Sequence, residues 1–583
     1  MTELFEPVGE HDWRLMVGAT GLLADFNRAG VLESADLHVA LRVSDLAGES
    51  DERVHLAVAL AVRSVRHGSV AVDLTTIAQV APELAWPHAA DWARALAASP
   101  LVAEGAVRLE HGLLYLDRYH RLESQVCADL RTRAAQPPPV VDEAVLEAAV
   151  TRVRAGRLSS EQEEAARRAV RQWTTVLTGG PGTGKTTTVA RILALVADQF
   201  DRSGERVSIA LSAPTGKAAA RLQEAVQAEL AVLEPADRAR IGSLEAMTLH
   251  RLLGWRPDNS TRFRHDRANR LKYDLVVVDE SSMVELTMMA RLLEAVRPQS
   301  RLVLVGDPRQ LTSVGAGAVL SDVVAGYADD PASPVVSLTE NFRSTEDIKR
   351  LAEALRTGDV EDVLAALRTE SDEVEFVETE DAGAVLREDT VAAALAVRRA
   401  AEQGDAPAAV AALDEHRLLC AHREGPHGVR HWNRQVEWWL GEELGQEIWS
   451  EWYPGRPLLV SANDYALGVY NGETGAAIVQ PDGRLRAVIA GSGGLLDFAP
   501  GRLESVETMH AMTIHKSQGS QAERVTVLLP DEGSRLLTRE LFYTAVTRAK
   551  SHVRVVGTEA AVRAAVETRA QRATGLRQRL AGN

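Results

Sequence analysis

The amino-acid sequence predicts an α/β protein with two lobes built on parallel sheets, a helical N-terminal domain and a small β-rich insertion in the second lobe. Short apolar runs of strand length alternate with amphipathic helical segments in two separate parts of the chain. Between them, around residues 440–505, glycine-rich turns separate short alternating segments. A chain of 583 residues is also too long for a single core, so several domains are expected.

The first 133 residues are predicted to form a mostly helical domain. Residues 1–135 carry 12 basic and 19 acidic side chains, a net charge of −7. The segment 134–141 contains three consecutive prolines, which favour an extended, semi-rigid connector. We therefore expect an N-terminal domain at 1–133 and a linker at 134–141. The acidic charge would suit a complementary patch on another protein, so the domain either mediates assembly, which is the role that the family resemblance described below implies, or caps the first lobe.

The two lobes are predicted over residues 142–335 and 336–583. Each contains apolar strands, and an amphipathic helix at 186–200 follows the first of them. The alanine-rich stretch 391–413 is expected to be helical. The expected strands lie at 175–177, 207–211, 275–278 and 302–305 in the first lobe and at 418–421, 525–529 and 553–556 in the second.

Composition limits the function classes. The net charge of −17 argues against a protein that coats nucleic acid electrostatically, but it permits one that grips a single strand in a narrow groove. Apolar runs are too short and too often interrupted by charge for a membrane span, and the acidic N-terminus lacks the pattern of a signal peptide. Only two cysteines are present, so we expect a cytoplasmic protein without a disulfide framework.

A glycine-rich loop after the first strand carries the strongest functional signal. Residues 179–186, GGPGTGKT, fit the P-loop pattern, with a strand before the loop and a helix after it. The glycines let backbone N–H groups turn toward phosphate oxygens, and the helix N-terminus favours negative charge. We expect Lys185 to reach the β- and γ-phosphates of ATP and Thr186 to ligate Mg²⁺. The expected nucleotide contacts are Gly179, Gly180, Pro181, Gly182, Thr183, Gly184, Lys185, Thr186 and Thr187.

Two carboxylates end the apolar strand at 275–278. Asp279 is expected to hold Mg²⁺, directly or through water, and Glu280 to act as the general base toward the attacking water. Acidic pairs at strand ends are usually solvated, but this pair follows a P-loop. The two motifs together predict an enzyme that hydrolyses ATP.

Further segments resemble motifs of superfamily 1 helicases. Residues 213–219 are similar to motif Ia, 304–311 to motif III, 338–344 to motif IV, 513–519 to motif V and 542–549 to motif VI. The resemblance implies that Gln310 senses the nucleotide state, and that Arg343 and Arg548 meet phosphoryl charge from the opposite lobe. Gln162 stands at the position of the Q motif, where an amide could recognise the adenine edge.

The combined set of motifs, together with residues 248–254, resembles the RecD family, the alpha subunits of RecBCD enzymes. The resemblance implies two RecA-like domains, a pin hairpin at about 255–271 and an SH3-like insertion at about 440–505. It also implies 5′→3′ translocation on single-stranded DNA from DNA ends, and a heterotrimer with RecB-like and RecC-like subunits in which a partner carries the nuclease. The expected DNA contacts are Thr215, Lys217, His250, Thr513, His515 and Lys516.

Two other functions stay open from sequence. A stand-alone superfamily 1 motor would unwind DNA or RNA as a monomer. A regulatory ATP switch would bind partners without translocating, and its ATPase activity would ignore single-stranded DNA.

Overall fold

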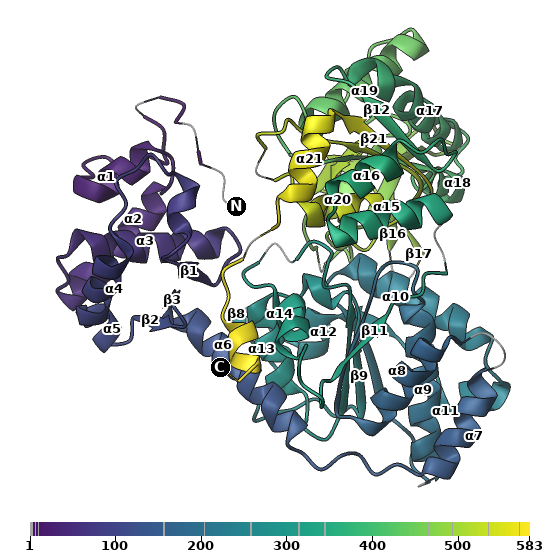
Figure 1. The fold of residues 1–583 in the computed structure, drawn as a ribbon. Helices are drawn as coiled ribbons and strands as arrows, with labels where there is room; N and C mark the ends of the chain where they lie inside the picture. Colours follow the sequence, from purple (N-terminus) through teal and green to yellow (C-terminus); the bar gives the residue numbers. More distant parts are fainter. Residues whose placement is uncertain are drawn as a thin grey trace.

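The computed structural model describes residues 4–5, 7–9, 11–154, 158–202, 204–256, 259–312, 315–342, 345–464, 466–491, 494–534, 536–570 and 572–582. Two α/β lobes lie one above the other, and the N-terminal domain stands beside them (Figure 1). This arrangement of parallel sheets agrees with the predicted fold class.

The N-terminal domain is helical, as predicted, and also contains a small antiparallel sheet that the sequence pattern did not indicate. Its core is formed where α1, α3 and α4 meet this sheet, around Phe26, Leu60 and Trp92. The sheet has the order β1-β3-β2. The elements are α1 (Gly21–Arg28), α2 (Ser34–Ala47), α3 (Glu52–Arg66), β1 (Ala71–Asp73), a 3₁₀ turn (Ile77–Val80), α4 (Ala89–Ala98), α5 (Pro100–Ala103), β2 (Val107–Glu110) and β3 (Leu113–Leu116).

A long helix, α6 (Asp117–Ala134), leads from this domain to the first lobe. Its last turn is anchored there, because the buried guanidinium of Arg133 donates to the carbonyl oxygens of Trp173 and Ser300, each at 2.6 Å. The helix therefore packs on the first lobe before the proline-rich linker begins. Removal of the chain before residue 134 would therefore remove Arg133 and expose the carbonyl oxygens of Trp173 and Ser300 that it binds.

The first lobe is a six-stranded parallel sheet of order β11-β4-β10-β9-β5-β6. Side chains along β9 alternate between two cores, with Val276 on one face and Val277 on the other, as expected for a sheet covered by helices on both sides. The strands are β4 (Thr174–Gly179), β5 (Ile209–Ala213), β6 (Ala246–Thr248), β9 (Leu275–Val278), β10 (Arg301–Gly306) and β11 (Val335–Leu338). The helices are α7 (Glu143–Arg154), α8 (Ser160–Arg171), α9 (Lys185–Arg202), α10 (Gly216–Ala231), α11 (Pro235–Ile241), α12 (Leu249–Leu253), a 3₁₀ turn (Ser281–Met283), α13 (Leu286–Ala295) and α14 (Val319–Gly326).

Two boundaries in this lobe differ from the prediction. Strand β11 pairs with β4, so the first lobe extends to Leu338 and does not end at residue 335. The hairpin is formed by β7 (Trp255–Arg256) and β8 (Asn259–Phe263) and is shorter than the predicted 255–271.

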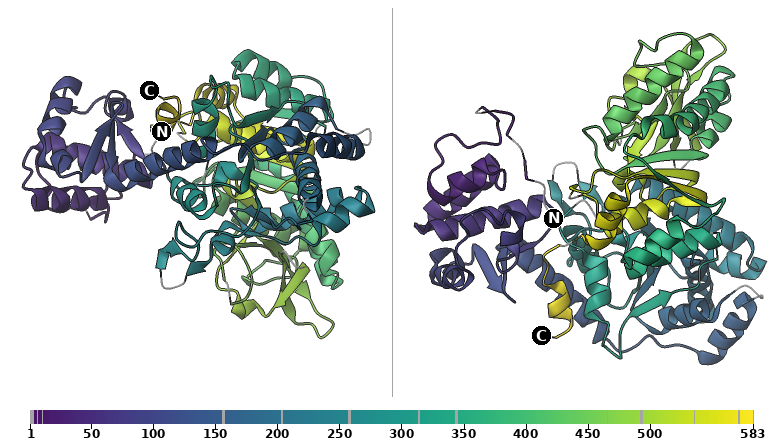
Figure 2. Two further views of the ribbon diagram at one scale, coloured as in Figure 1. Left: turned by 90° about the horizontal axis from the view of Figure 1, so that it is seen from below. Right: turned by 45° about the horizontal axis from the view of Figure 1, so that its top comes forward.

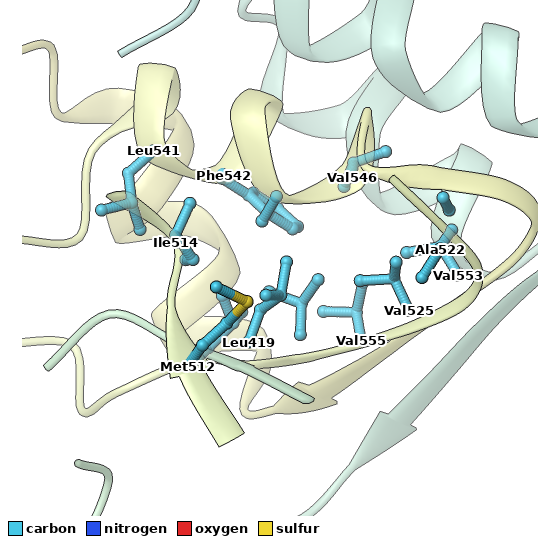
Figure 3. Packing of buried hydrophobic residues seen from close by; sticks show 14 of the residues in the cluster. Leu419, Met512, Ile514, Ala522, Val525, Leu541, Phe542, Val546, Val553 and Val555 are labelled. Atoms are coloured by element: carbon cyan, nitrogen blue, oxygen red, sulfur yellow. The ribbon is translucent and has the colours of Figure 1, made fainter. Parts of the chain in front are cut away.

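The second lobe has a five-stranded parallel sheet of order β12-β21-β20-β13-β19. Helix α20 covers one face, and Figure 3 shows Phe542 and Val546 lying over Leu419 and Val525. The strands are β12 (Val374–Glu378), β13 (His416–Cys420), β19 (Ala511–Thr513), β20 (Ala522–Leu528) and β21 (Ala549–Gly557). The helices are α15 (Glu346–Thr357), α16 (Val360–Leu367), α17 (Gly383–Glu402), α18 (Ala406–Ala412), α19 (Val429–Leu444), a 3₁₀ turn (His515–Ser517), α20 (Arg539–Val546) and α21 (Glu559–Glu567).

A separate antiparallel sheet of order β17-β16-β15-β14-β18 lies beneath the second lobe in the left view of Figure 2. It corresponds to the predicted insertion but starts later, because α19 occupies the residues up to 444. Its likeness to an SH3 domain stays a prediction. The elements are β14 (Pro457–Val460), β15 (Thr474–Val479), β16 (Leu485–Gly491), β17 (Gly494–Phe498), a 3₁₀ turn (Pro500–Arg502) and β18 (Val506–Thr508).

The C-terminal segment 572–582 does not stay with the second lobe, which is a correction to the predicted range 336–583. Its short helix α22 (Leu576–Leu580) packs against α14 and α6, as the yellow ribbon in Figures 1 and 2 shows. The carbonyl oxygen of Ala573 accepts hydrogen bonds from the backbone of Val70 and Ala71 in the N-terminal domain. Because this segment continues the chain of the second lobe, its contacts attach the second lobe to the first lobe and to the N-terminal domain.

Within the described residues, no helix combines the length and the apolarity needed to cross a bilayer.

Candidate nucleotide site and interlobe cleft

A cavity of about 590 Å³ lies between the two lobes beside the P-loop. The first lobe contributes the loop, the turn after β10 and the end of β11, and the second contributes α15 and α20. The functional side chains follow the carboxyl ends of parallel strands, where ligands bind in open α/β sheets. Among the lining residues are Gly179, Gly180, Pro181, Thr183, Asp307, Arg309, Asn341, Lys349, Arg356 and Tyr543.

The P-loop has the backbone that its glycines predict. Gly182 and Gly184 adopt φ angles of 83° and 77°, in the left-handed region that favours glycine. The ammonium group of Lys185 donates to the carbonyl oxygens of Gly179 and Gly180 at 2.8 and 2.9 Å. The lysine is therefore folded onto its own loop, and its contact with phosphates would replace these two bonds.

The hydroxyls that follow the loop differ in their surroundings. Thr183 Oγ1 donates to the carbonyl oxygen of Gly180 at 2.9 Å and braces the loop. Thr187 Oγ1 donates to Glu229 of α10 at 2.9 Å, so only its backbone N–H remains for a phosphate. Thr186 is partly exposed at the first turn of α9, where a magnesium ligand is expected.

The acidic pair lies at the end of β9. Burial and the neighbouring Glu280 carboxylate raise the pKa of Asp279 to about 6, while the charge of Lys185 acts in the opposite direction. Glu280 has φ 49° and ψ 40°, a left-handed conformation that costs a non-glycine residue about 1–2 kcal/mol. Such conformations concentrate at functional sites, because the surrounding structure imposes them.

The donor set fits Mg²⁺. Thr186 offers a hydroxyl and Asp279 a carboxylate, and hard oxygen ligands supplemented by phosphate oxygens and water are what Mg²⁺ prefers. In the described part of the chain, no group of three or more His, Cys, Asp or Glu side chains forms a metal cluster.

Gln310 and Arg548 lie next in the chain to residues that line the cavity, Arg309 and Thr547, and their predicted roles toward the nucleotide stay predictions. Gln310 is buried, and its Nε2 donates to Asp307 Oδ2 at 3.3 Å. Arg548 of the second lobe is buried too, with Nε donating to the carbonyl oxygen of Thr544 at 3.0 Å. Burial lowers the pKa of Arg548, and the negative charge of Glu280 opposes this shift more than any other neighbouring group. Arg343 lies outside the described residues.

Gln162 occupies a position that the prediction did not anticipate. Its Oε1 accepts from the backbone of Ser159 in a capping box, and its Nε2 donates to the carbonyl oxygen of Thr183 at 3.2 Å. A side chain on Gly184 would clash with this amide. Both ends of the amide are therefore engaged with protein, and its recognition of adenine stays a prediction.

The predicted motif Ia residues lie where the insertion meets the first lobe. Thr215 caps α10, its Oγ1 accepting from Ala218 N at 3.2 Å. A side chain on Gly216 would meet Tyr470 of the insertion at 2.6 Å, so the two backbones approach closely. Burial lowers the pKa of Lys217 to about 7, and the nearby Glu473 carboxylate opposes that shift.

The remaining predicted DNA contacts have protein neighbours of several kinds. The ring centroids of His250 and of Phe263 in the hairpin lie 5.8 Å apart. Thr513 Oγ1 accepts from Lys516 N, and the Lys516 ammonium group pairs with Glu507 of the insertion at 2.9 Å. His515 is mostly buried, and burial lowers its pKa. The role of these six residues in binding DNA stays a prediction.

Sequence reasoning missed Phe342. Its side chain is 54% exposed, unusual for a large apolar residue, and its backbone N–H donates to the carbonyl oxygen of Gly182 at 2.9 Å. The ring stands beside the P-loop near Gly184. An aromatic residue next to the motif IV arginine was the available signal, and only the fold shows that it faces the nucleotide loop.

The fold and the site define a P-loop ATPase of the helicase type, with two parallel α/β lobes and motifs from both lobes at one cleft. The family described as AAA domain matches residues 162–316. The UvrD-like helicase C-terminal domain matches 508–556, and the RecBCD enzyme subunit RecD N-terminal domain matches 28–115.

Curated relatives identify the family. The chain is 58% identical over 573 residues to the RecBCD enzyme subunit RecD of Mycobacterium tuberculosis, with 97% of each chain covered. It is 60% identical over 557 residues to that of Mycolicibacterium smegmatis, covering 95% of this chain and 98% of the relative. A Bacteroides Pif1 helicase solved with ADP-AlF3 and single-stranded DNA is 17% identical, with a TM-score of 0.39 over 68% of this chain and 92% of that one. The chain belongs to the RecD family.

Proposed function

We propose that this chain is the ATP-driven 5′→3′ DNA motor of a RecBCD-type helicase–nuclease that processes double-strand breaks. What supports the proposal is the electrostatic proximity of motif residues from both lobes: the charge of Lys185 acts on Asp279, and the Glu280 carboxylate of the first lobe acts on Arg548 of the second. ATP hydrolysis at such a cleft is coupled to movement of the lobes, because the catalytic set is complete only when they meet.

In the proposed reaction, the P-loop backbone and Lys185 hold the phosphates while Glu280 accepts the proton of the attacking water. Mg²⁺, held by Thr186 and Asp279, would supply charge neutralisation at the phosphates. Arg548 meets the negative charge that spreads over the transferring phosphoryl group. Phe342 is placed to support the adenine ring by stacking.

The proposed path for single-stranded DNA runs along the carboxyl edges of β5 and β19, past Thr215 and Thr513. Arg221 of α10, the helix that begins in motif Ia, donates to the carbonyl oxygen of Gly519 in motif V at 2.6 Å and so joins the two lobes. A strand on this path would contact both lobes, so changes in their separation would move it. The net charge of −17 fits delivery of the strand by partner subunits rather than long-range attraction.

The proposed partners are RecB-like and RecC-like subunits, one of which carries the nuclease. The N-terminal domain lies to one side of the two lobes (Figure 1), and its net charge of −7 over residues 1–135 would suit a complementary basic patch on a partner.

Co-expression with and without these partners tests the proposal. We expect the chain to copurify with them and to hydrolyse ATP faster when single-stranded DNA is added. A chain whose ATPase ignores DNA would be a regulatory switch, and a stable monomer that unwinds DNA without partners would be a stand-alone helicase.

A further inference from the structure

One carboxylate at the cleft receives hydrogen bonds from both lobes. The Tyr543 hydroxyl of α20 donates to Asp307 Oδ2 at 3.0 Å, and the Gln310 amide donates to the same oxygen at 3.3 Å. The other oxygen, Oδ1, accepts from the backbone N–H of Arg309 at 3.0 Å. Asp307 is buried, so its oxygens depend on these protein donors for partners.

The same hydroxyl touches the nucleotide loop. A Cβ on Gly180 would come within 3.0 Å of Tyr543 Oη, a tight contact that the phenol could relieve only by moving a few tenths of an ångström, so the glycine leaves room for it beside the P-loop. Tyr543 is 5% exposed, and burial raises its pKa well above the usual value, which keeps the hydroxyl protonated as a donor. A single group of the second lobe therefore contacts both the P-loop and the carboxylate beside Gln310.

Two neighbouring bonds hold the same turn. The backbone N–H of Leu311 donates to Thr544 Oγ1 at 2.9 Å, and Gln518 Nε2 donates to the carbonyl oxygen of Leu311 at 2.6 Å. The turn 307–311 is thus fastened to the second lobe by three bonds, and separation of the lobes would break all of them. Only the Tyr543 bond shares its acceptor atom with Gln310.

We propose that Tyr543 is a positioning residue that communicates lobe closure to Gln310 through their shared acceptor, Asp307. When the lobes are closed, the Tyr543 hydroxyl donates to Asp307 Oδ2. The Gln310 amide can then give up its long bond to that oxygen and donate to a phosphate oxygen of the nucleotide instead. When the lobes part, Tyr543 no longer donates to Asp307 Oδ2, and of these two side chains only Gln310 still does. The Gln310 amide then stays bonded to Asp307 and does not reach the phosphate. The inference rests on the proposed ATPase function and on the expected role of Gln310.

Steady-state ATP hydrolysis by the full chain, with saturating single-stranded DNA, tests this role in Tyr543→Phe. The change keeps the ring in its core and removes only the hydroxyl. Because a hydrogen bond to a charged group is at stake, we expect kcat to fall about 10-fold or more. The KM for ATP should change less than about 2-fold, since the contact matters mainly after binding.

A matched control separates positioning from general stability. Tyr453 is equally buried in the second lobe and donates to Glu437 Oε1 at 3.0 Å, away from the cleft. Tyr453→Phe should leave kcat unchanged. In the background of Asp307→Ala, adding Tyr543→Phe should have little further effect, because the shared acceptor is already absent.

The outcomes are distinct. Normal kcat in Tyr543→Phe beside an active wild type would overturn the inference and leave the proposed function standing. Equal losses in the Tyr543 and Tyr453 variants, or additive losses with Asp307→Ala, would also overturn it. A wild-type chain without ATPase activity would overturn both the inference and the proposed function.

Discussion

The docking of the C-terminal segment 572–582 can be tested quantitatively. Leu576 is 1% exposed and packs in the same core as Leu122, Val126 and Val323. Leu576→Ala removes this contact and leaves a cavity, at a cost of about 2–5 kcal/mol for a buried leucine. If the segment opens locally, the free energy of that opening falls by the same amount, which corresponds to roughly 30-fold or more in the opening equilibrium.

Hydrogen exchange of the full chain, followed by peptide mass spectrometry, measures this effect. Amides in 573–582 should exchange about 30-fold faster or more in Leu576→Ala, while strand β20 keeps its wild-type rate. Leu46→Ala is the matched control, because Leu46 is 71% exposed on α2 and its loss should change nothing. The docking of 572–582 on α6 and α14 would be refuted if the Leu576 variant exchanged at the wild-type rate. It would also be refuted if the segment were already unprotected in the wild type.

Three further changes act on the nucleotide site. Lys185→Ala should lower ATP turnover at least about 100-fold without unfolding the chain, because the ammonium group is needed at phosphates and not in a core; normal turnover would remove the loop from catalysis. Glu280→Gln should bind ATP yet hydrolyse it about 10²- to 10⁴-fold more slowly in single-turnover assays, and lost binding with a normal bound-state rate would assign it a structural role. Arg548→Ala should lower kcat about 10³-fold or more with little change in ATP affinity, whereas a raised KM alone would exclude a transition-state contact.

Much of the fold follows from local pattern. The strands that became β9 and β10 are continuous apolar runs, since both faces of a parallel sheet are covered by helices. The P-loop was equally clear, because left-handed backbone at Gly182 and Gly184 requires glycine at fixed spacing. Motifs whose chemistry depends on residues close together in the chain are therefore visible in sequence.

Other features depend on contacts between distant segments, which periodicity does not record. The Tyr543–Asp307 bond joins residues 236 positions apart, and the return of α22 to α6 brings together Cys127 and Arg579, which are 452 positions apart. Gln162 is a case in which the sequence motif did not reveal the contacts of the side chain, a capping box with Ser159 and a bond to the P-loop carbonyl of Thr183; its recognition of adenine stays a prediction. Residues 1–133 are also joined to the first lobe more closely than a separate domain would be, through α6 and the segment 572–582, and their role in assembly stays a prediction.

The central claim, that this chain is a DNA motor driven by its own ATP site, is tested most directly by unwinding. Duplex DNA with a 5′ single-stranded tail is given to the complex assembled with wild-type chain and to the same complex carrying Lys185→Ala. The account predicts that the wild-type complex displaces the strand from the 5′ tail and that the variant complex, although fully assembled, loses this activity. Equal unwinding of the 5′-tailed duplex by both complexes would contradict it.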